Sequence, residues 1–338
     1  MKSKVKIIAE VGVNHDGNLQ KAKKLIKICK NIGADFIKFQ SFKTDSLVTI
    51  NSKKSKYQLK KNSKNNSLYK MLKKVELSYK DTIKLFEYAK KIDIEIISTP
   101  FDKLSSDELE NLKMKVFKIS SGDIDNIPLI EHVAKKNKPI IISTGRSTFK
   151  DIDKAIKFIK KNNNNKISIL HCVSSYPTKY KDLNLNTIKK LKEKYSFEIG
   201  FSDHSLGIEA PIAAVALGAT IIEKHITLDK KNQGPDHFFS LVPLEFEMMI
   251  RQIRNIESAM GSSVKKINQS EIEGLRKSRR SLYSFTDIYK NQIFNENNIS
   301  ILRPADGLKP IDIYKFIGRR SKDNIKKGTL LKLSMIKK

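Results

Sequence analysis

The 338-residue sequence contains only two cysteines, no tryptophan and no long apolar run. Cys29 and Cys172 are too few for a disulfide framework, which indicates a reducing compartment. The longest uncharged apolar stretch, residues 210–222, is shorter than the ~20 residues that a membrane helix requires. The residues before Glu10 include no apolar signal core, so we expect a cytoplasmic protein without a membrane partner.

Acidic residues are in the minority: 66 Lys and Arg against 36 Asp and Glu give a net charge of +30. This balance fits a nucleic acid, an acidic membrane surface or a small acidic substrate as partner. The lysines are spread through every segment, whereas nucleic-acid proteins concentrate charge on one face with exposed aromatics. The one dense block, residues 51–74, holds nine lysines and no acidic residue. We expect it to be a solvated loop, with a polyanion contact as the alternative.

Short β-branched runs alternate with amphipathic helical stretches through most of the chain. Eight runs predict strands, at residues 5–9, 35–40, 94–98, 116–120, 139–143, 167–172, 197–202 and 220–223. Helical patterns lie at residues 19–31, 80–91, 127–136, 149–161, 185–195, 208–217 and 243–260. Near-continuous apolar runs are typical of parallel strands covered on both faces. Eight β-then-α units over ~260 residues predict a closed (β/α)8 barrel. The alternative is an open doubly wound sheet, but no Gly-rich phosphate-binding turn follows the first predicted strand.

The pattern changes after residue 260, where short strands and turns replace the β-then-α alternation. We therefore predict a barrel domain over 1–262, a charged linker over 263–280 and a small β-rich domain over 281–338. Two similar segments of the tail each predict a turn with positive φ, at Asn291 and at Gly328. A piece of ~58 residues is marginal alone, so we expect it to dock onto the barrel or a second chain.

Polar residues concentrate where the predicted strands end, which is the edge on which a barrel builds its site. Five of the six histidines lie there, and only His132 falls on a helix, where a surface position is expected. His204 and His225 follow neighbouring strands, while His171 beside Cys172 fits a packed role equally well. Three carboxylates are expected nearby, those of Glu10, Glu223 and Asp236. Such a donor set suits Mn²⁺ or a similar divalent ion; satisfied polar groups at strand ends are the alternative.

Two lysines, Lys38 and Lys118, lie inside apolar strand runs. Each must point into the barrel mouth or lose its hydration without compensation. An anionic ligand is the economical explanation, with residues 121–122 and 143–145 helping to hold a phosphate and a carboxylate. The alternative is an internal salt bridge to a carboxylate such as Glu10.

Eight motifs occur in order along the chain: IAEVGVNHDG (8–17), KFQ (38–40), STPF (98–101), FKISSG (117–122), STG (143–145), SDH (202–204), IEKH (222–225) and GPDH (234–237). With this set the sequence resembles the N-acetylneuraminate (sialic acid) synthase family, which condenses phosphoenolpyruvate with an N-acetylated amino sugar. The tail resembles the antifreeze-like (SAF) domain that follows the barrel in that family, with residues 302–307 matching its arginine-bearing loop.

The resemblance implies roles for particular residues. It assigns a divalent metal, Mn²⁺ or else Mg²⁺ or Co²⁺, to His204 and His225. It assigns phosphoenolpyruvate to Lys38, Thr99, Lys118, Ser121, Ser143 and Ser202. It implies that a further set of residues faces the sugar, the activated water or the intermediate: Glu10, Gln40, Tyr176, Glu223, Asp236 and Arg303. Of these, Glu10, Glu223 and Asp236 are expected to act in catalysis together with His204. A domain-swapped homodimer would bring Arg303 to the partner's site.

Two positions depart from the family pattern. Ser174 stands where members have asparagine, which alters the expected phosphate contacts in that loop. Asn291 replaces a glycine common in the tail, but asparagine tolerates the left-handed conformation, so the turn is expected to survive.

The resemblance implies condensation of phosphoenolpyruvate with N-acetylmannosamine and water, giving N-acetylneuraminic acid and phosphate by C–O cleavage. Glu10 is our choice for the base that activates the water. The first alternative acceptor is 2,4-diacetamido-2,4,6-trideoxymannose, which gives legionaminic acid. A pseudaminic acid synthase and an enzyme with a sugar-phosphate acceptor are the next alternatives. Outside this class, a polyanion-binding protein and a non-catalytic barrel remain open, and the first would bind nucleic acid at moderate salt.

Overall fold

The computed structural model describes residues 4–59 and 66–338. These fall into two compact units, Met1–Gly261 and Ser262–Lys338, and each is described by itself. Within the described ranges no helix combines the length and the apolar character needed to cross a bilayer. The boundaries predicted from the sequence, 1–262, 263–280 and 281–338, stay a prediction.

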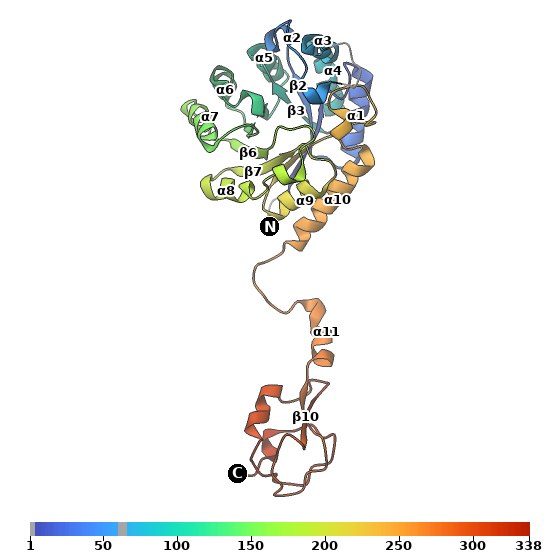
Figure 1. The fold of residues 1–338 in the computed structure, drawn as a ribbon, viewed down its shortest axis with the longest axis vertical. Coiled ribbons are helices and arrows are strands. Elements are labelled where there is room, and N and C mark those ends of the chain that lie inside the picture. The colour runs from blue at the N-terminus through green and yellow to red at the C-terminus, as the bar shows by residue number, and fades with distance from the viewer. Residues whose placement is uncertain (1–3, 60–65) are drawn as a thin grey trace. The chain divides into compact units, whose positions relative to one another are not determined.

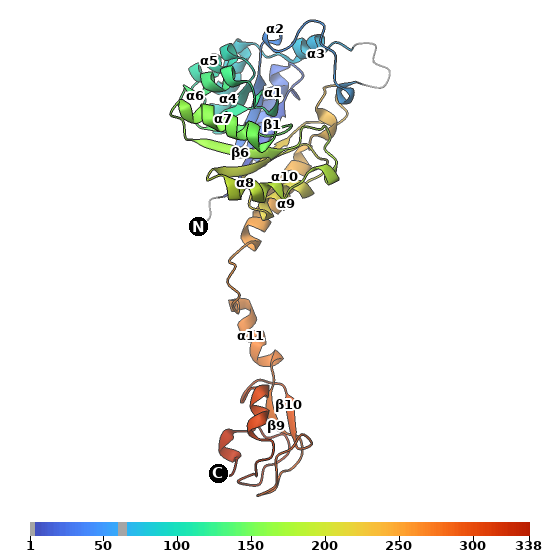
Figure 2. The same ribbon diagram turned by 60° about the vertical axis from the view of Figure 1, so that its left-hand side comes forward.

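In the first unit, helices surround a group of β-strands (Figures 1 and 2). The strands form a closed parallel barrel in which they pair in sequence order and β8 pairs with β1. Its strands are β1 (Lys6–Gly12), β2 (Phe36–Ser41), β3 (Glu95–Pro100), β4 (Phe117–Ile119), β5 (Ile140–Ser143), β6 (Ile167–Cys172), β7 (Glu198–Asp203) and β8 (Ile221–His225). The α-helices around it are α1 (Leu19–Asn31), α2 (Thr44–Leu47), α3 (Leu68–Val75), α4 (Tyr79–Lys91), α5 (Lys103–Asn111), α6 (Ile127–Ala134), α7 (Phe149–Lys161), α8 (Thr187–Lys194), α9 (Glu209–Ala216) and α10 (Pro243–Ala259). The predicted (β/α)8 barrel is confirmed.

Short 3-10 turns complete the connections. They are η1 (Lys56–Gln58), η2 (Ser121–Asp123), η3 (Tyr180–Asp182) and η4 (His237–Phe239) in the first unit, with η5 (Pro310–Lys315) and η6 (Leu333–Met335) in the second. Two of them follow β4 and β8 at the mouth of the barrel, where they hold Ser121 and His237.

Alternation along the strands fixes what faces the barrel axis. Ile8, Ile97, Ile141, Leu170 and Ile221 pack together as one apolar layer inside the barrel. The residue two positions later on a strand points to the same face, one step nearer the carboxyl end. The next layer is therefore polar and consists of Glu10, Thr99, Ser143, Cys172 and Glu223. This layer forms the floor of the candidate site.

The loop predicted for residues 51–74 is wrong over its last part, because Leu68–Val75 forms α3. Ser67 caps this helix by accepting a hydrogen bond from the Lys70 backbone N–H. Val75 is buried against Val13 and Phe42, and Leu72 packs on the same cluster. This tertiary packing decides the conformation of a segment whose composition is mainly polar.

The second unit carries α11 (Gln269–Ser278), which lies within the predicted linker, and an antiparallel pair of strands, β9 (Ser281–Ser284) and β10 (Ile299–Leu302). Its small core consists of Leu282, Ile288, Phe294, Ile299, Phe316, Ile325 and Leu331. Asn291 and Gly328 have φ of 66° and 80°, which confirms both turns expected at positive φ.

Candidate active site

A cavity of about 310 Å³ opens at the carboxyl ends of the barrel strands. The site residues predicted on the barrel all line it: Glu10, Lys38, Gln40, Thr99, Lys118, Ser121, Ser143, Ser174, Tyr176, Ser202, His204, Glu223, His225 and Asp236. Arg303 belongs to the second unit, where it is exposed in the residues after β10. The roles of these residues stay predictions, but the barrel brings those of the first unit together.

Two lysines and two carboxylates form a buried network on the floor of the cavity. Lys38 Nζ lies 2.8 Å from Glu10 Oε2 and 3.9 Å from Glu223 Oε2. Lys118 Nζ lies 3.8 Å from Glu223 Oε2. None of the four side chains is more than 6% exposed. The β1–β2 register places Glu10 directly opposite Lys38, so the internal salt bridge considered from the sequence is present.

The surroundings shift the pKa values of Glu10 and Glu223 in opposite directions. Burial raises the pKa of Glu10, and the negative charge of Glu223 adds to this effect while Lys38 opposes it. Burial would also raise the pKa of Glu223, but the charges of Lys118 and Lys38 bring it below its usual range. Glu223 therefore stays ionised while Glu10 takes up a proton more readily. Paired carboxylates with unequal pKa values can divide acid and base roles between them.

Hydroxyl groups complete the polar wall around Lys118. Lys118 Nζ donates a hydrogen bond to Ser143 Oγ at 2.5 Å, and the Gly145 N–H donates to Ser121 Oγ at 2.9 Å. A Cβ on Gly145 would lie 2.2 Å from Ser174 Oγ and 3.1 Å from the Ser174 backbone nitrogen, so a larger residue would force this loop to shift. The arrangement gathers a cation and several donors in one corner, which suits an anionic oxygen group.

His204 and His225 lie side by side, with ring centroids 5.5 Å apart. His204 Nδ1 donates to the carbonyl oxygen of Val173 at 3.1 Å, which leaves Nε2 able to accept. His225 Nδ1 is buried, and no hydrogen-bond partner for it exists among the described residues. Burial first, and then the nearby His204, hold the pKa of His225 well below its usual value, which favours the neutral, ligating form.

These two imidazoles fit a divalent ion that takes its other ligands from water and substrate. Within residues 4–59 and 66–338, no group of three or more His, Cys, Asp and Glu side chains has the geometry to hold a metal ion. The metal site predicted at His204 and His225, with Glu10, Glu223 and Asp236 nearby, stays a prediction. Asp236 Oδ2 lies 4.0 Å from His225 Nδ1, and burial raises the Asp236 pKa to about 7.

The family comparison agrees with this site. Residues 25–265 match the model described as NeuB family, and residues 279–337 match the SAF domain model. The chain belongs to the NeuB family. It is 44% identical over 97% of its length to an N,N'-diacetyllegionaminic acid synthase from Campylobacter jejuni, of which 99% is covered. It is 38% identical to a pseudaminic acid synthase from the same species, with 98% of this chain and 96% of the relative covered.

A solved structure shows the same architecture. The N-acetylneuraminic acid synthetase from Leptospira borgpetersenii, crystallised with citrate, matches 80% of this NeuB-family chain at 36% identity, with a TM-score of 0.71. The match covers 90% of that protein's chain.

The remaining strand-end histidines of this NeuB barrel have structural partners. His171 Nε2 lies 2.7 Å from the Leu183 carbonyl oxygen, and its ring stacks on Phe201. His237 contacts Thr227 Oγ1 at 2.6 Å and Asp16 Oδ1 at 3.0 Å. His15 Nδ1 accepts from the Gly17 N–H. His132 lies on α6, half-buried beside Asp107.

The sequence analysis missed several residues that line the cavity, among them Tyr57, Met71, Leu72 and Arg146. Tyr57 stacks on Tyr176 with ring centroids 4.9 Å apart. Three of these four come from the lysine-rich segment 51–74, so the solvated loop expected there is wrong for these residues. The apolar residues between the lysines were the available signal.

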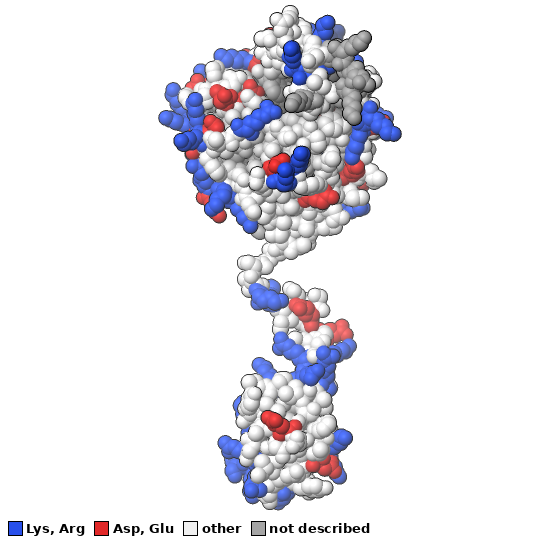
Figure 3. Space-filling view, in the orientation of Figure 1, with Lys and Arg blue, Asp and Glu red and all other residues white. Residues whose placement is uncertain are grey.

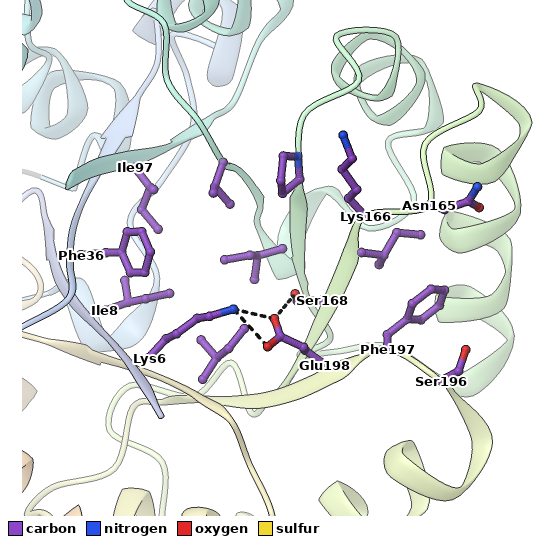
Figure 4. A pocket seen from close by; sticks show the side chains of 15 residues that line it. Lys6, Ile8, Phe36, Ile97, Asn165, Lys166, Ser168, Ser196, Phe197 and Glu198 are labelled. Atoms are coloured by element: carbon purple, nitrogen blue, oxygen red, sulfur yellow. Dashed lines mark hydrogen bonds and ion pairs between the residues drawn. The ribbon is translucent and has the colours of Figure 1, made fainter. Parts of the chain in front are cut away.

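A second cavity, of about 430 Å³, lies at the amino ends of the strands (Figure 4). Ile8, Ile97 and Phe36 point into it, and the apolar barrel layer separates it from the candidate site. Its rim carries an ion pair between Lys6 and Glu198 at 2.8 Å, which Figure 4 shows. Its lining includes no histidine among the described residues, and it lies at the end of the barrel opposite the one where such barrels place their sites, so the opposite mouth remains the candidate active site.

Basic side chains are distributed over the visible face of each unit as separate groups (Figure 3). They stand among uncharged and acidic residues and form no single stripe on the face shown. A polyanion-binding surface typically concentrates its charge along one face. The face in Figure 3 therefore offers no support for the nucleic-acid alternative.

Proposed function

We propose that the chain is a phosphoenolpyruvate-dependent nonulosonic acid synthase, with 2,4-diacetamido-2,4,6-trideoxymannose as its acceptor. The observation that carries the reaction class is the single barrel mouth that joins two buried lysines, a pair of unequal carboxylates and two imidazoles. A dianionic or trianionic donor fits the lysines, and an aldehyde acceptor fits the imidazole end.

The acceptor is argued from similarity and shape. The chain shares 44% identity with a diacetyllegionaminic acid synthase and 36% with a sialic acid synthetase, which supports the diacetamido sugar over N-acetylmannosamine. Val13, Leu72 and Phe101 give one wall of the cavity an apolar character. The methyl groups of a 6-deoxy, diacetylated sugar would lie favourably against such a wall.

In the proposed mechanism, C3 of phosphoenolpyruvate attacks C1 of the open-chain sugar, and positive charge develops at the former C2. The chemistry that a divalent ion held by His204 and His225 supplies is Lewis-acid polarisation of the aldehyde oxygen. Glu10 takes a proton from the water that adds to the cationic carbon. The tetrahedral intermediate then expels phosphate through cleavage of its C–O bond. Lys38 and Lys118 neutralise the donor's charges throughout.

We also propose a domain-swapped homodimer in which Arg303 of one chain reaches the mouth of the other barrel. Arg303 is exposed, and its guanidinium takes part in no ion pair within the described residues. A cation from the second unit would contact a polar substituent of the sugar, leaving the donor to the barrel lysines.

The experiment that tests the proposal measures phosphate release from phosphoenolpyruvate with Mn²⁺, with each sugar offered in a separate tube. We expect metal-dependent turnover with a kcat/KM at least ~10-fold higher for the diacetamido-trideoxy sugar, because each well-placed apolar group contributes about 1–3 kcal/mol to discrimination. Product masses identify the acids, and chelated samples are the control. An equal or higher kcat/KM with N-acetylmannosamine would reassign the acceptor. Release of phosphate without formation of a new acid would contradict the synthase function.

A further inference from the structure

Among the described residues that line the cavity, Arg146 is a cation without a carboxylate partner. The basic side chains of the cavity are those of Lys38, Lys118 and Arg146, and its acidic ones are those of Glu10, Glu223 and Asp236. Both lysines face carboxylates within 4.0 Å, so much of their charge is balanced inside the protein. Arg146 forms no ion pair within the part of the chain that the structure describes, and its one hydrogen bond there goes to a backbone carbonyl. A phosphate monoester brings a charge of about −1.5 to −2 into this balanced site.

Arg146 is held beside the hydroxyl corner of the site. It follows Ser143, Thr144 and Gly145 at the end of β5. Its Nη2 donates to the Ser174 carbonyl oxygen at 3.2 Å. This bond uses one of the five N–H donors of the guanidinium, so most of its fork remains available to a ligand. Such a planar fork matches two phosphate oxygens at once.

The backbone of Arg146 adopts a conformation that its residue type disfavours. Its φ is 60°, and the other described non-glycine residues with positive φ are Asp or Asn, except Lys113. Lys113 has an ordinary explanation, since it follows the carboxyl end of α5, where left-handed residues are common. Arg146 instead follows a strand at the mouth of the cavity. Backbone strain at such a place is typical of functional positions.

The neighbouring loop brings Arg146 next to a second polar group. Ser174 and Arg146 both line the cavity, and the guanidinium donates to the Ser174 backbone carbonyl. A serine hydroxyl supplies a single hydrogen-bond donor, so the free N–H groups of Arg146 are the larger source of donors at this position.

We propose that Arg146 binds the phosphate group of the donor substrate and afterwards the released inorganic phosphate. The residue is a ligand of the phosphate and takes no part in proton transfer. This inference rests on the proposed function for the identity of the donor, but phosphate binding by itself can be measured without any sugar.

The test compares Arg146→Ala, Arg146→Lys and Arg146→Gly with the wild type, by calorimetry with inorganic phosphate and by steady-state kinetics. Loss of a charge-assisted, two-pronged contact is expected to weaken phosphate binding and raise the KM for phosphoenolpyruvate ~10- to 100-fold, with the sugar KM within ~2-fold. Lysine restores the charge without the fork and is expected to give an intermediate value. Arg251→Ala, at an exposed arginine on α10, is the matched control.

Glycine adopts positive φ without steric cost, so Arg146→Gly keeps the loop and separates a binding defect from misfolding. Cooperative melting of this variant with weakened phosphate binding supports the proposal. Wild-type phosphate affinity in the Ala and Gly variants, a rise in the sugar KM alone, or no phosphate binding by the wild type overturns it. Arg146-dependent phosphate binding in a protein that makes no acid would uphold Arg146 while rejecting the synthase function.

Discussion

Replacing Glu10 by glutamine is expected to lower kcat ~10³-fold while the KM for phosphoenolpyruvate changes by less than ~3-fold. The amide keeps the shape of the side chain and an oxygen for Lys38, which lies 2.8 Å from the carboxylate in the wild type. It cannot accept the proton from the attacking water. Removing this negative charge also leaves Lys38 more available to the anionic donor, so donor binding is preserved.

The measurement is steady-state phosphate release over a range of phosphoenolpyruvate concentrations. Glu87→Gln, at an exposed glutamate on α4, serves as control and is expected to behave as the wild type. Equal losses in kcat and in donor affinity would reject the base role. Such a result would instead assign Glu10 to binding, through its contact with Lys38.

Replacing His204 or His225 by alanine is expected to remove Mn²⁺ binding and to lower turnover by ~10³-fold or more. A bound Lewis acid contributes several kcal/mol to stabilising charge on the reacting oxygen, and each ~1.4 kcal/mol corresponds to a tenfold change in rate. No third protein ligand of the kinds that bind metals is in place among the described residues, so loss of one imidazole leaves a single ligand.

Calorimetric titration with Mn²⁺ and rates before and after chelation test this expectation. His132→Gln, at the half-buried histidine on α6, is the control and is expected to keep both Mn²⁺ binding and metal-dependent turnover. A His225 variant that binds Mn²⁺ as the wild type does, or a wild type whose turnover survives complete chelation, would refute the metal site.

The barrel could be predicted from the sequence because its strands and helices have recognisable local patterns of apolar and polar residues. The apolar runs and the amphipathic stretches gave α1 and α7 their observed bounds. The position of polar residues at strand ends then indicated one mouth, since parallel strands in a barrel present their carboxyl ends together. The pairing of Lys38 with Glu10 stayed open, because it depends on the β1–β2 register and on rotamers that one sequence does not fix.

What the sequence could not predict depends on long-range packing. The segment 51–74 looks solvated by composition, yet Val75 is buried against Val13 and Phe42, and Tyr57 stacks on Tyr176. The contribution of Arg146 depends on a positive φ that arginine rarely adopts, so no local propensity signals it. The metal ligands predicted from the strand ends stay a prediction, because the side-chain geometry that a bound ion requires is not encoded in the local sequence pattern.

The central claim, that carbon–carbon bond formation between phosphoenolpyruvate and an amino sugar accompanies C–O cleavage, is tested most directly with an isotope. The protein is incubated with Mn²⁺, the diacetamido-trideoxy sugar and phosphoenolpyruvate that carries ¹⁸O in its bridging oxygen. The masses of the released phosphate and of the acid are then measured by mass spectrometry. We predict that the label leaves entirely with phosphate and that an unlabelled acid forms in equal amount. Label retained in the acid, or labelled phosphate without a new acid, would contradict the account.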